Sequence, residues 1–153
     1  MWHNKSTLVL IFIAGFTVGT LDMFYACLFW DIKADVSPLR IFQSVAAGLL
    51  GQQSFQGGYA TAALGLGLHF LIAILMAATY IVATLRLAWL NTSPYLYGSL
   101  YGAALYSIMH FIVLPLSAAG PSTPDTIWIT LTVLVHMLLV GVPIALFARG
   151  QSN

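Results

Sequence analysis

Charged residues are almost absent from this sequence. Only 6% of its 153 residues are charged and none is glutamate, whereas a soluble domain carries about 25% charge. The only acidic residues are four aspartates, so hydrolysis by paired carboxylates has no support. No nucleophile or phosphate-loop motif is present either. The five lysines and arginines are scattered, which argues against nucleic acid as a partner. The single cysteine, Cys27, excludes an internal disulfide and any cysteine-rich metal site.

Apolar residues dominate what is present. They make up 60% of the sequence, and the mean hydropathy is +0.94. Four apolar runs are long enough to cross a bilayer, at about 7–30, 58–85, 95–116 and 126–148. The first run could suggest a signal peptide. It lacks a small-residue cleavage site after a short apolar core, so we interpret it as a retained span. We therefore predict a single all-α membrane domain over 1–153, a bundle of four transmembrane helices in contact with the lipid bilayer.

The only long connection, between the first two spans, contains a further helical pattern. Ser37 and Pro38 have the form of an N-cap followed by proline at the first helical position. Apolar residues then recur at helical spacing, which predicts a short amphipathic helix at about 38–51. This segment is too short to span, so it is expected to lie in the outer interface or to dip back over the bundle. A brace and a lid over a site are both open interpretations.

Small residues at helical spacing predict how the spans pack. In the second span, one face about 80° wide carries small and polar residues, and the opposite face is apolar and suited to lipid. Each span also has a pair of small residues four positions apart, which lets helix backbones approach closely. The face consists of Ala62, Gly65, His69, Ala73, Met76, Tyr80 and Ala83, and the pairs are Gly15/Gly19, Ala73/Ala77, Gly98/Gly102 and Gly141/Ala145.

The basic residues indicate an orientation. Four spans place both termini on one side, where Lys5, Arg86 and Arg149 would lie. The opposite side carries Lys33 and Arg40. The positive-inside rule therefore weakly favours cytoplasmic termini, by three basic residues to two.

One ionisable residue lies in each span, and together the four are nearly all the ionisable groups of the apolar core. They are Asp22, His69, His110 and His136. At about 1.5 Å per residue they lie about 8 to 15 Å from the outer ends of their helices, in the outer half of the membrane. Polar groups at this depth must face protein or a wet cavity, so we expect at least three of them to face the bundle interior.

Four interpretations of these residues are open. They could satisfy one another by hydrogen bonds that only hold the helices together. They could form a site for a proton or a cation, with Asp22 as the acceptor. All four could ligate a divalent cation such as Zn²⁺, although no local ligand motif is present. Finally, His69 and His136, which have matched depth, could be the axial ligands of a b-type haem.

Three stretches carry a resemblance to a known family. They are HFLIAILMAATYIVA from His69, YGSLYGAALYSIMHFIVLPL with His110 five residues before Pro115, and HMLLVGVPIAL from His136. Over about the last 90 residues the chain resembles small bacterial inner-membrane proteins of the YagU type. The resemblance implies a bacterial inner-membrane location and supplies no reaction, substrate or cofactor.

The favoured hypothesis is a non-enzymatic membrane protein whose cluster of Asp22, His69, His110 and His136 binds protons or a cation. A structural accessory subunit of a larger membrane complex, or a homo-oligomer, is the alternative of a different class. A haem-bearing electron-transfer subunit is the third.

Overall fold

Helices make up all of the regular structure in the part of the chain that is described. The computed structural model describes residues 3–120 and 125–150. In chain order the elements are α1 (His3–Ala34), α2 (Pro38–Leu50), η1 (Gly51–Gln56), α3 (Gly58–Thr84), η2 (Ala88–Asn91), α4 (Pro94–Ile108), η3 (Met109–Val113), α5 (Leu114–Leu116), α6 (Thr126–Val135), η4 (His136–Gly141) and α7 (Val142–Arg149). The segments η1 and η2 are 3₁₀-helical, whereas η3 and η4 are π-helical.

Four continuous helical stretches are long and apolar enough to cross a membrane, so the prediction of an all-α fold with four such helices is confirmed. They cover Ser6–Ala34, Gly58–Thr84, Pro94–Leu116 and Thr126–Arg149. The last three agree with the predicted spans to within one residue at each end. The first continues past the predicted end at 30, because α1 closes only where Asp35 adopts a positive φ of 51° and its N–H bonds to the Asp31 carbonyl.

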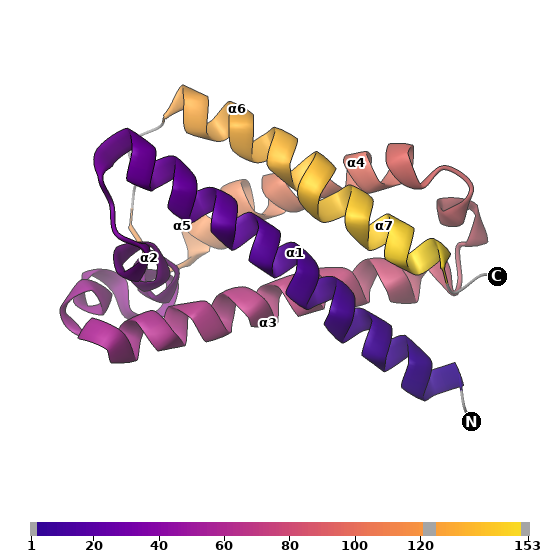
Figure 1. The fold of residues 1–153 in the computed structure, drawn as a ribbon, viewed down its shortest axis with the longest axis horizontal. Coiled ribbons are helices and arrows are strands. Elements are labelled where there is room, and N and C mark those ends of the chain that lie inside the picture. The colour runs from indigo at the N-terminus through magenta and orange to yellow at the C-terminus, as the bar shows by residue number, and fades with distance from the viewer. Residues whose placement is uncertain (1–2, 121–124, 151–153) are drawn as a thin grey trace.

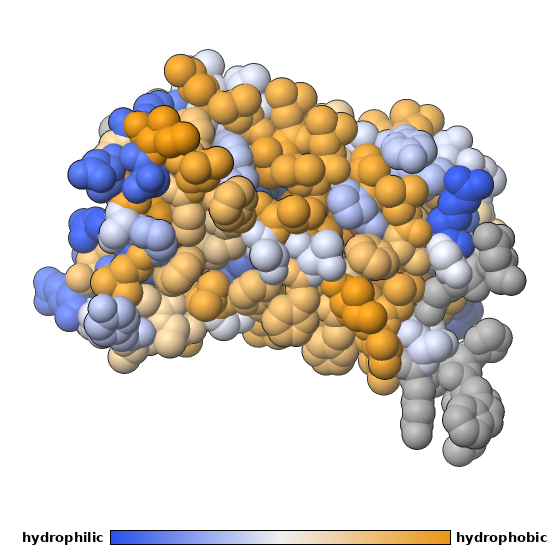
Figure 2. Space-filling view, viewed as in Figure 1, coloured by the Kyte–Doolittle hydropathy of each residue, from blue (hydrophilic) through white to orange (hydrophobic). Residues whose placement is uncertain are grey.

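The outside of the bundle is apolar between two more polar ends. Figure 2 shows orange side chains along the length of the molecule, with most of the blue ones gathered at the end where α1 turns into α2. Large apolar side chains are exposed on all four long helices, among them Phe24, Leu75, Phe111 and Ile127. An apolar surface of this extent requires a partner or a lipid environment. The start of α1 and the end of α7 lie at the same end of the molecule (Figure 1).

The small-residue pairs lie where the helices pack, as predicted. Gly15 and Gly19 of α1 face α3, where a Cβ on Gly19 would lie 3.1 Å from Ala73 Cβ. Gly98 of α4 faces α7, where a Cβ would lie 3.0 Å from Ala145 Cβ. The small-residue face of α3 also points inward, because Ala62, Gly65, Ala73 and Tyr80 are buried. Close backbone approach therefore pairs α1 with α3 and α4 with η4 and α7.

The packed core occupies the half of the bundle near the termini. Its members include Ile11, Ala77, Ile81 and Ile144, which are almost fully buried. Toward the opposite end, which we call the outer end after its predicted orientation, the four helices surround a cavity. The helix α2 lies across this end and is seen nearly end-on in Figure 1.

The predicted short helix is confirmed as α2, with Pro38 at its first turn. Ser37 occupies the N-cap position, but its hydroxyl forms no capping hydrogen bond. Hydrogen bonds tie α2 to its neighbours: Gln43 Nε2 donates to the Gly58 carbonyl at 3.1 Å and to the Thr61 hydroxyl at 3.4 Å, and the Ala118 N–H donates to the Gly48 carbonyl at 2.9 Å. Because α2 is fastened to the start of α3 and to the segment after α5, it covers the outer end of the bundle.

An ion pair and an aromatic cluster join α1 to α6 at the outer end. Lys33 donates to the Asp125 carboxylate, which also caps α6 by accepting from the Trp128 N–H at 2.9 Å. The Trp128 ring stacks on Tyr25, with centroids 5.3 Å apart and planes 5° from parallel. Aromatic side chains at this level are typical of the border between a membrane and water.

The substitution Asp125→Asn is expected to lower the melting temperature above about pH 5 and to have little effect in strong acid. The hydrogen bond from Lys33, followed by that from the Trp128 N–H, lowers the pKa of the Asp125 carboxyl from its ordinary 3.8. A lowered pKa means that the folded state binds the proton less tightly than the unfolded chain does. The stabilisation is therefore present above pH 3.8 and is lost as the pH falls through the folded-state pKa. Thermal scans of the wild-type protein and Asp125→Asn between about pH 2 and 6 measure this stabilisation. Equal melting temperatures of the two proteins at every pH would contradict the prediction.

Candidate functional site

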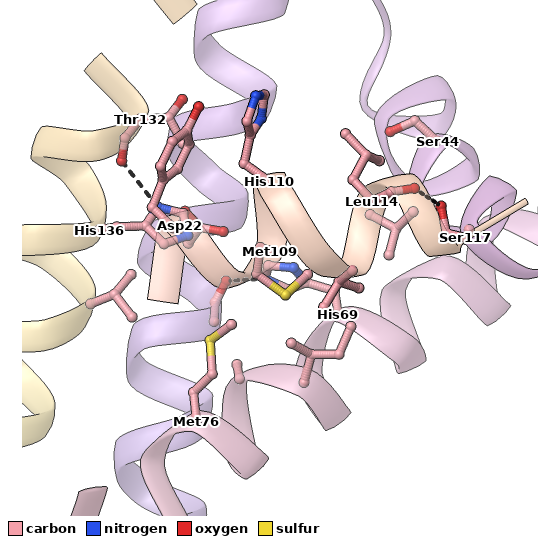
Figure 3. A pocket seen from close by; sticks show the side chains of 18 of the residues that line it. Asp22, Ser44, His69, Met76, Met109, His110, Leu114, Ser117, Thr132 and His136 are labelled. Atoms are coloured by element: carbon pink, nitrogen blue, oxygen red, sulfur yellow. Dashed lines mark hydrogen bonds and ion pairs between the residues drawn. The ribbon is translucent and has the colours of Figure 1, made fainter. Parts of the chain in front are cut away.

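A cavity of about 390 Å³ lies between α2 and the four long helices, and all four predicted residues line it. This volume falls in the range of small-molecule sites, about 300–1,000 Å³, and far exceeds the roughly 30 Å³ of one water. An adjoining cavity of about 210 Å³ shares Asp22, His69 and His136 and continues to Trp30 and Ile41 at the outer end. Figure 3 shows the polar side chains arriving from different helices around this space. The expectation that these residues face the bundle interior is confirmed.

Among the described residues, Asp22 supplies the only carboxylate in the cavity wall, and no donor from them reaches it. Its side chain is 23% exposed, in a position where the face of α1 that carries Gly15 and Gly19 continues into the cavity. The described part of the chain offers it no hydrogen bond, and the titratable group paired with it there is His136, whose Nδ1 lies 3.8 Å from Oδ1. A carboxylate without donors in apolar surroundings is unfavourable, so this residue is the least satisfied group of the site.

The backbone holds His69 in one tautomer. Its Nε2 lies 2.8 Å from the Gly19 carbonyl oxygen, which can only accept, so Nε2 carries the proton. The absence of a side chain on Gly19 lets α3 come close enough for this bond. The bond links α1 to α3 and confirms the expectation that a backbone carbonyl pairs with one imidazole. It also directs His69 to the backbone and away from the carboxylate.

His136 is held in the opposite tautomer. Its Nδ1 lies 3.0 Å from the carbonyl oxygen of Thr132, one turn earlier in the same helix, so Nδ1 carries the proton. The side chain is only 12% exposed. The Thr132 hydroxyl in turn pairs with Tyr25 at 3.1 Å, which fixes the neighbouring part of α6.

His110 forms ring contacts in place of hydrogen bonds. Its imidazole stacks on the phenol ring of Tyr106, with centroids 5.4 Å apart and planes 11° from parallel. The same phenol meets His136 edge to face at 5.7 Å. Tyr106 therefore stands between the two imidazoles. Tyr106 was not predicted as a site residue, although its position four residues before His110 places both on one helix face.

Both His110 and His136 lie in π-helical segments that precede prolines. Pro115 and Pro143 have no N–H to donate, and their rings would clash with the carbonyl four residues earlier in a regular α-helix. The wider turns of η3 (Met109–Val113) and η4 (His136–Gly141) accommodate these prolines. Segments of this kind frequently occur at functional sites.

The predicted four-ligand metal site is not formed. Among residues 3–120 and 125–150 no three His, Cys, Asp or Glu side chains are grouped so that they could hold a metal ion. The expected buried cluster of all four side chains is not formed in the described chain either, because His69 turns to the Gly19 carbonyl and His110 to the Tyr106 ring. What remains is the pair Asp22 and His136 in a shared cavity.

The haem interpretation stays a prediction. His136 matches an axial ligand, because Nδ1 is hydrogen-bonded to a backbone carbonyl and Nε2 has no partner in the described chain. His69 engages Nε2 with Gly19 and would have to ligate through Nδ1 or give up that bond.

Comparisons with protein-family models, with curated proteins and with solved structures find no match for this chain. The resemblance to the YagU type therefore stays a prediction. Any proposal for function depends on the geometry of the cavity.

Proposed function

We propose that this chain is a multi-pass, non-enzymatic membrane protein in which Asp22 binds a proton or a cation, with His136 as its partner. One observation carries the proposal: the Asp22 carboxylate faces a cavity of about 390 Å³ with no hydrogen-bond donor, 3.8 Å from the His136 Nδ1. The outer apolar surface and the four span-length helices support a membrane location.

The physical reason is the cost of an uncompensated charge. Removing a carboxylate from water costs several kcal/mol unless a donor or a cation replaces the lost hydration. A proton on Asp22, a proton on His136 that creates an ion pair, or a bound cation would each relieve this cost. The other titratable groups that face the pair across the cavity are His69 of α3, Tyr106 of α4 and His110 of η3.

We infer a location in the bacterial inner membrane, with cytoplasmic termini. The location depends on the resemblance to the YagU type, and the orientation on Lys5, Arg86 and Arg149 at the end that carries the termini. Lys33, at the other end, is neutralised by Asp125. Reporter fusions at Asn153 and at Ser122 test the orientation, since they should report the cytoplasm and the opposite side respectively.

The substitution Asp22→Asn tests the proposed function. Asparagine keeps the shape of the side chain and removes the charge, so the variant should fold. The melting temperature of the wild-type protein in detergent is expected to change between about pH 5 and 8, the range in which an unperturbed histidine changes charge. Much of this change should disappear in Asp22→Asn, because His136 then has no charged partner.

Asp31→Asn is the matched control. Asp31 is on the same helix, is exposed and lies outside the cavity wall, so this variant should keep the wild-type pH profile. A wild-type profile that is flat, or that Asp22→Asn leaves unchanged, would leave helix packing as the role of these residues.

A further inference from the structure

Three polar groups of the cavity can accept a hydrogen bond from a ligand. Asp22 is an acceptor when ionised. His69 donates its Nε2 proton to Gly19 and His136 donates its Nδ1 proton to Thr132, so the remaining nitrogens, His69 Nδ1 and His136 Nε2, are acceptors in the neutral rings. Neither nitrogen has a hydrogen bond in the described chain, and neither is among its fully buried unsatisfied atoms. The carboxylate and these two nitrogens are therefore free to accept hydrogen bonds, and a ligand that pairs with all three must bring several donors.

Most of the remaining wall is apolar. Side chains of Val18, Ile72, Met76, Met109 and Val140 enclose the space around the carboxylate. The rings of Tyr106 and Trp128 also line it. A ligand that fits therefore joins a cationic, donor-rich head to an apolar body.

The mouth of the cavity lies beside α2. Ser44, Val113 and Leu114 line the cavity and are nevertheless exposed, which places an opening between α2 and the segment formed by η3 and α5. Val113 and Leu114 are 39% and 37% exposed on the apolar outer surface. An amphiphile could thus place its head at Asp22 and leave its chain in this opening, next to lipid.

We propose that the cavity binds a primary ammonium group carried on an apolar chain, an alkylamine-type amphiphile, with Asp22 as the counter-ion. The proposal rests on the proposed function, in which Asp22 is the cation-binding residue, and adds the class of cation. An ammonium group supplies three donors, enough for the carboxylate and the two free imidazole nitrogens. A bare metal ion fits less well, since no group of three ligands is present among the described residues.

Decylamine is the probe, and the full chain in a non-ionic detergent at pH 7 is the sample. The amine is protonated at this pH, as lysine is. Tryptophan fluorescence reports binding, because Trp128 lines the cavity, and Trp128→Phe should remove most of the signal. We expect decylamine to bind saturably to the wild-type protein and to the control Asp31→Asn. Asp22→Asn should bind about ten- to a hundredfold more weakly, the loss expected for a hydrogen bond to a charged group.

Chain-matched decanol and decanoate separate the head group from the chain. Decanol should bind the wild-type protein at least about tenfold more weakly than decylamine, and decanoate should show no saturable binding. This comparison needs no variant, so it decides the question even if Asp22→Asn fails to fold. Equal affinity for decylamine and decanol, equal affinity of wild-type protein and a folded Asp22→Asn for decylamine, or no saturable binding of decylamine would overturn the proposal.

The two proposals fail separately. If the ligand-free protein shows the Asp22-dependent pH profile and decylamine does not bind, the amine site is wrong and the proton site stands. If decylamine binds through Asp22 while the pH profile is flat, Asp22 binds an organic cation and no proton.

Discussion

A Gly102→Ala protein is expected to be less stable than the wild type by about 2 kcal/mol. A Cβ on Gly102 of α4 would overlap the His136 carbonyl oxygen and lie 2.7 Å from Met137 Cα, so two backbones would have to separate. Overpacking costs about 1–3 kcal/mol, and a clash with backbone belongs at the upper end. Alanine recovers about 1 kcal/mol through its higher helix propensity, which leaves a net loss of about 2 kcal/mol in stability. Because the displaced segment carries His136, the Asp22-dependent pH response should also weaken.

Gly67→Ala is the control for this prediction. Gly67 lies within α3, and a Cβ there would meet no atom within 4 Å. The added methyl should therefore leave stability unchanged or raise it by about 0.5–1 kcal/mol. Thermal unfolding in one detergent compares the three proteins. If Gly102→Ala is as stable as Gly67→Ala, α4 and η4 do not approach each other as closely as the structure has them.

Gly65→Ala is expected to loosen α2 from α3. A Cβ on Gly65 would overlap the Phe42 carbonyl oxygen and lie 3.0 Å from the Ala46 backbone nitrogen. The cost should again be about 2 kcal/mol after the gain in helix propensity. The displaced element is α2, which covers the outer end of the cavity, so limited proteolysis within residues 35–57 should be faster than in the wild type. Cleavage at the same rate in Gly65→Ala and Gly67→Ala would contradict this role of the contact.

Most of the fold could be predicted from hydropathy and small-residue spacing. The spans agree with the observed helices because a stretch of about 20 apolar residues has few alternatives to a long helix. The inward face of α3, from Ala62 to Tyr80, was recognisable from the 3.6-residue period. The sequence did not predict which pairs of small residues meet. Gly19 lies opposite Ala73 and Gly98 opposite Ala145, and these pairings depend on the order of the helices in the bundle, which hydropathy does not reveal.

The site was predicted only in part, for physical reasons. One ionisable residue per span identified which side chains line the cavity, since burial in the bundle is the only inexpensive location for them. Their mutual arrangement depends on helix rotation and on competition from backbone carbonyls. Gly19 offers such an acceptor to His69 and Thr132 offers one to His136, and both bonds oppose a compact metal site. The π-helical segments follow from Pro115 and Pro143, but their extent depends on packing against neighbouring helices.

The reaction of Asp22 with a hydrophobic carbodiimide, followed by mass spectrometry, tests most directly whether this carboxyl group binds a proton. Carbodiimides react with protonated carboxyl groups, and an apolar reagent can enter the cavity through the opening beside Val113 and Leu114. We predict that Asp22 is modified in the folded protein, and more slowly with decylamine present. The exposed Asp31 and Asp35 are internal controls whose rates decylamine should not change. Absence of any modification of Asp22, in protein that remains folded, would contradict a proton-binding site in the cavity.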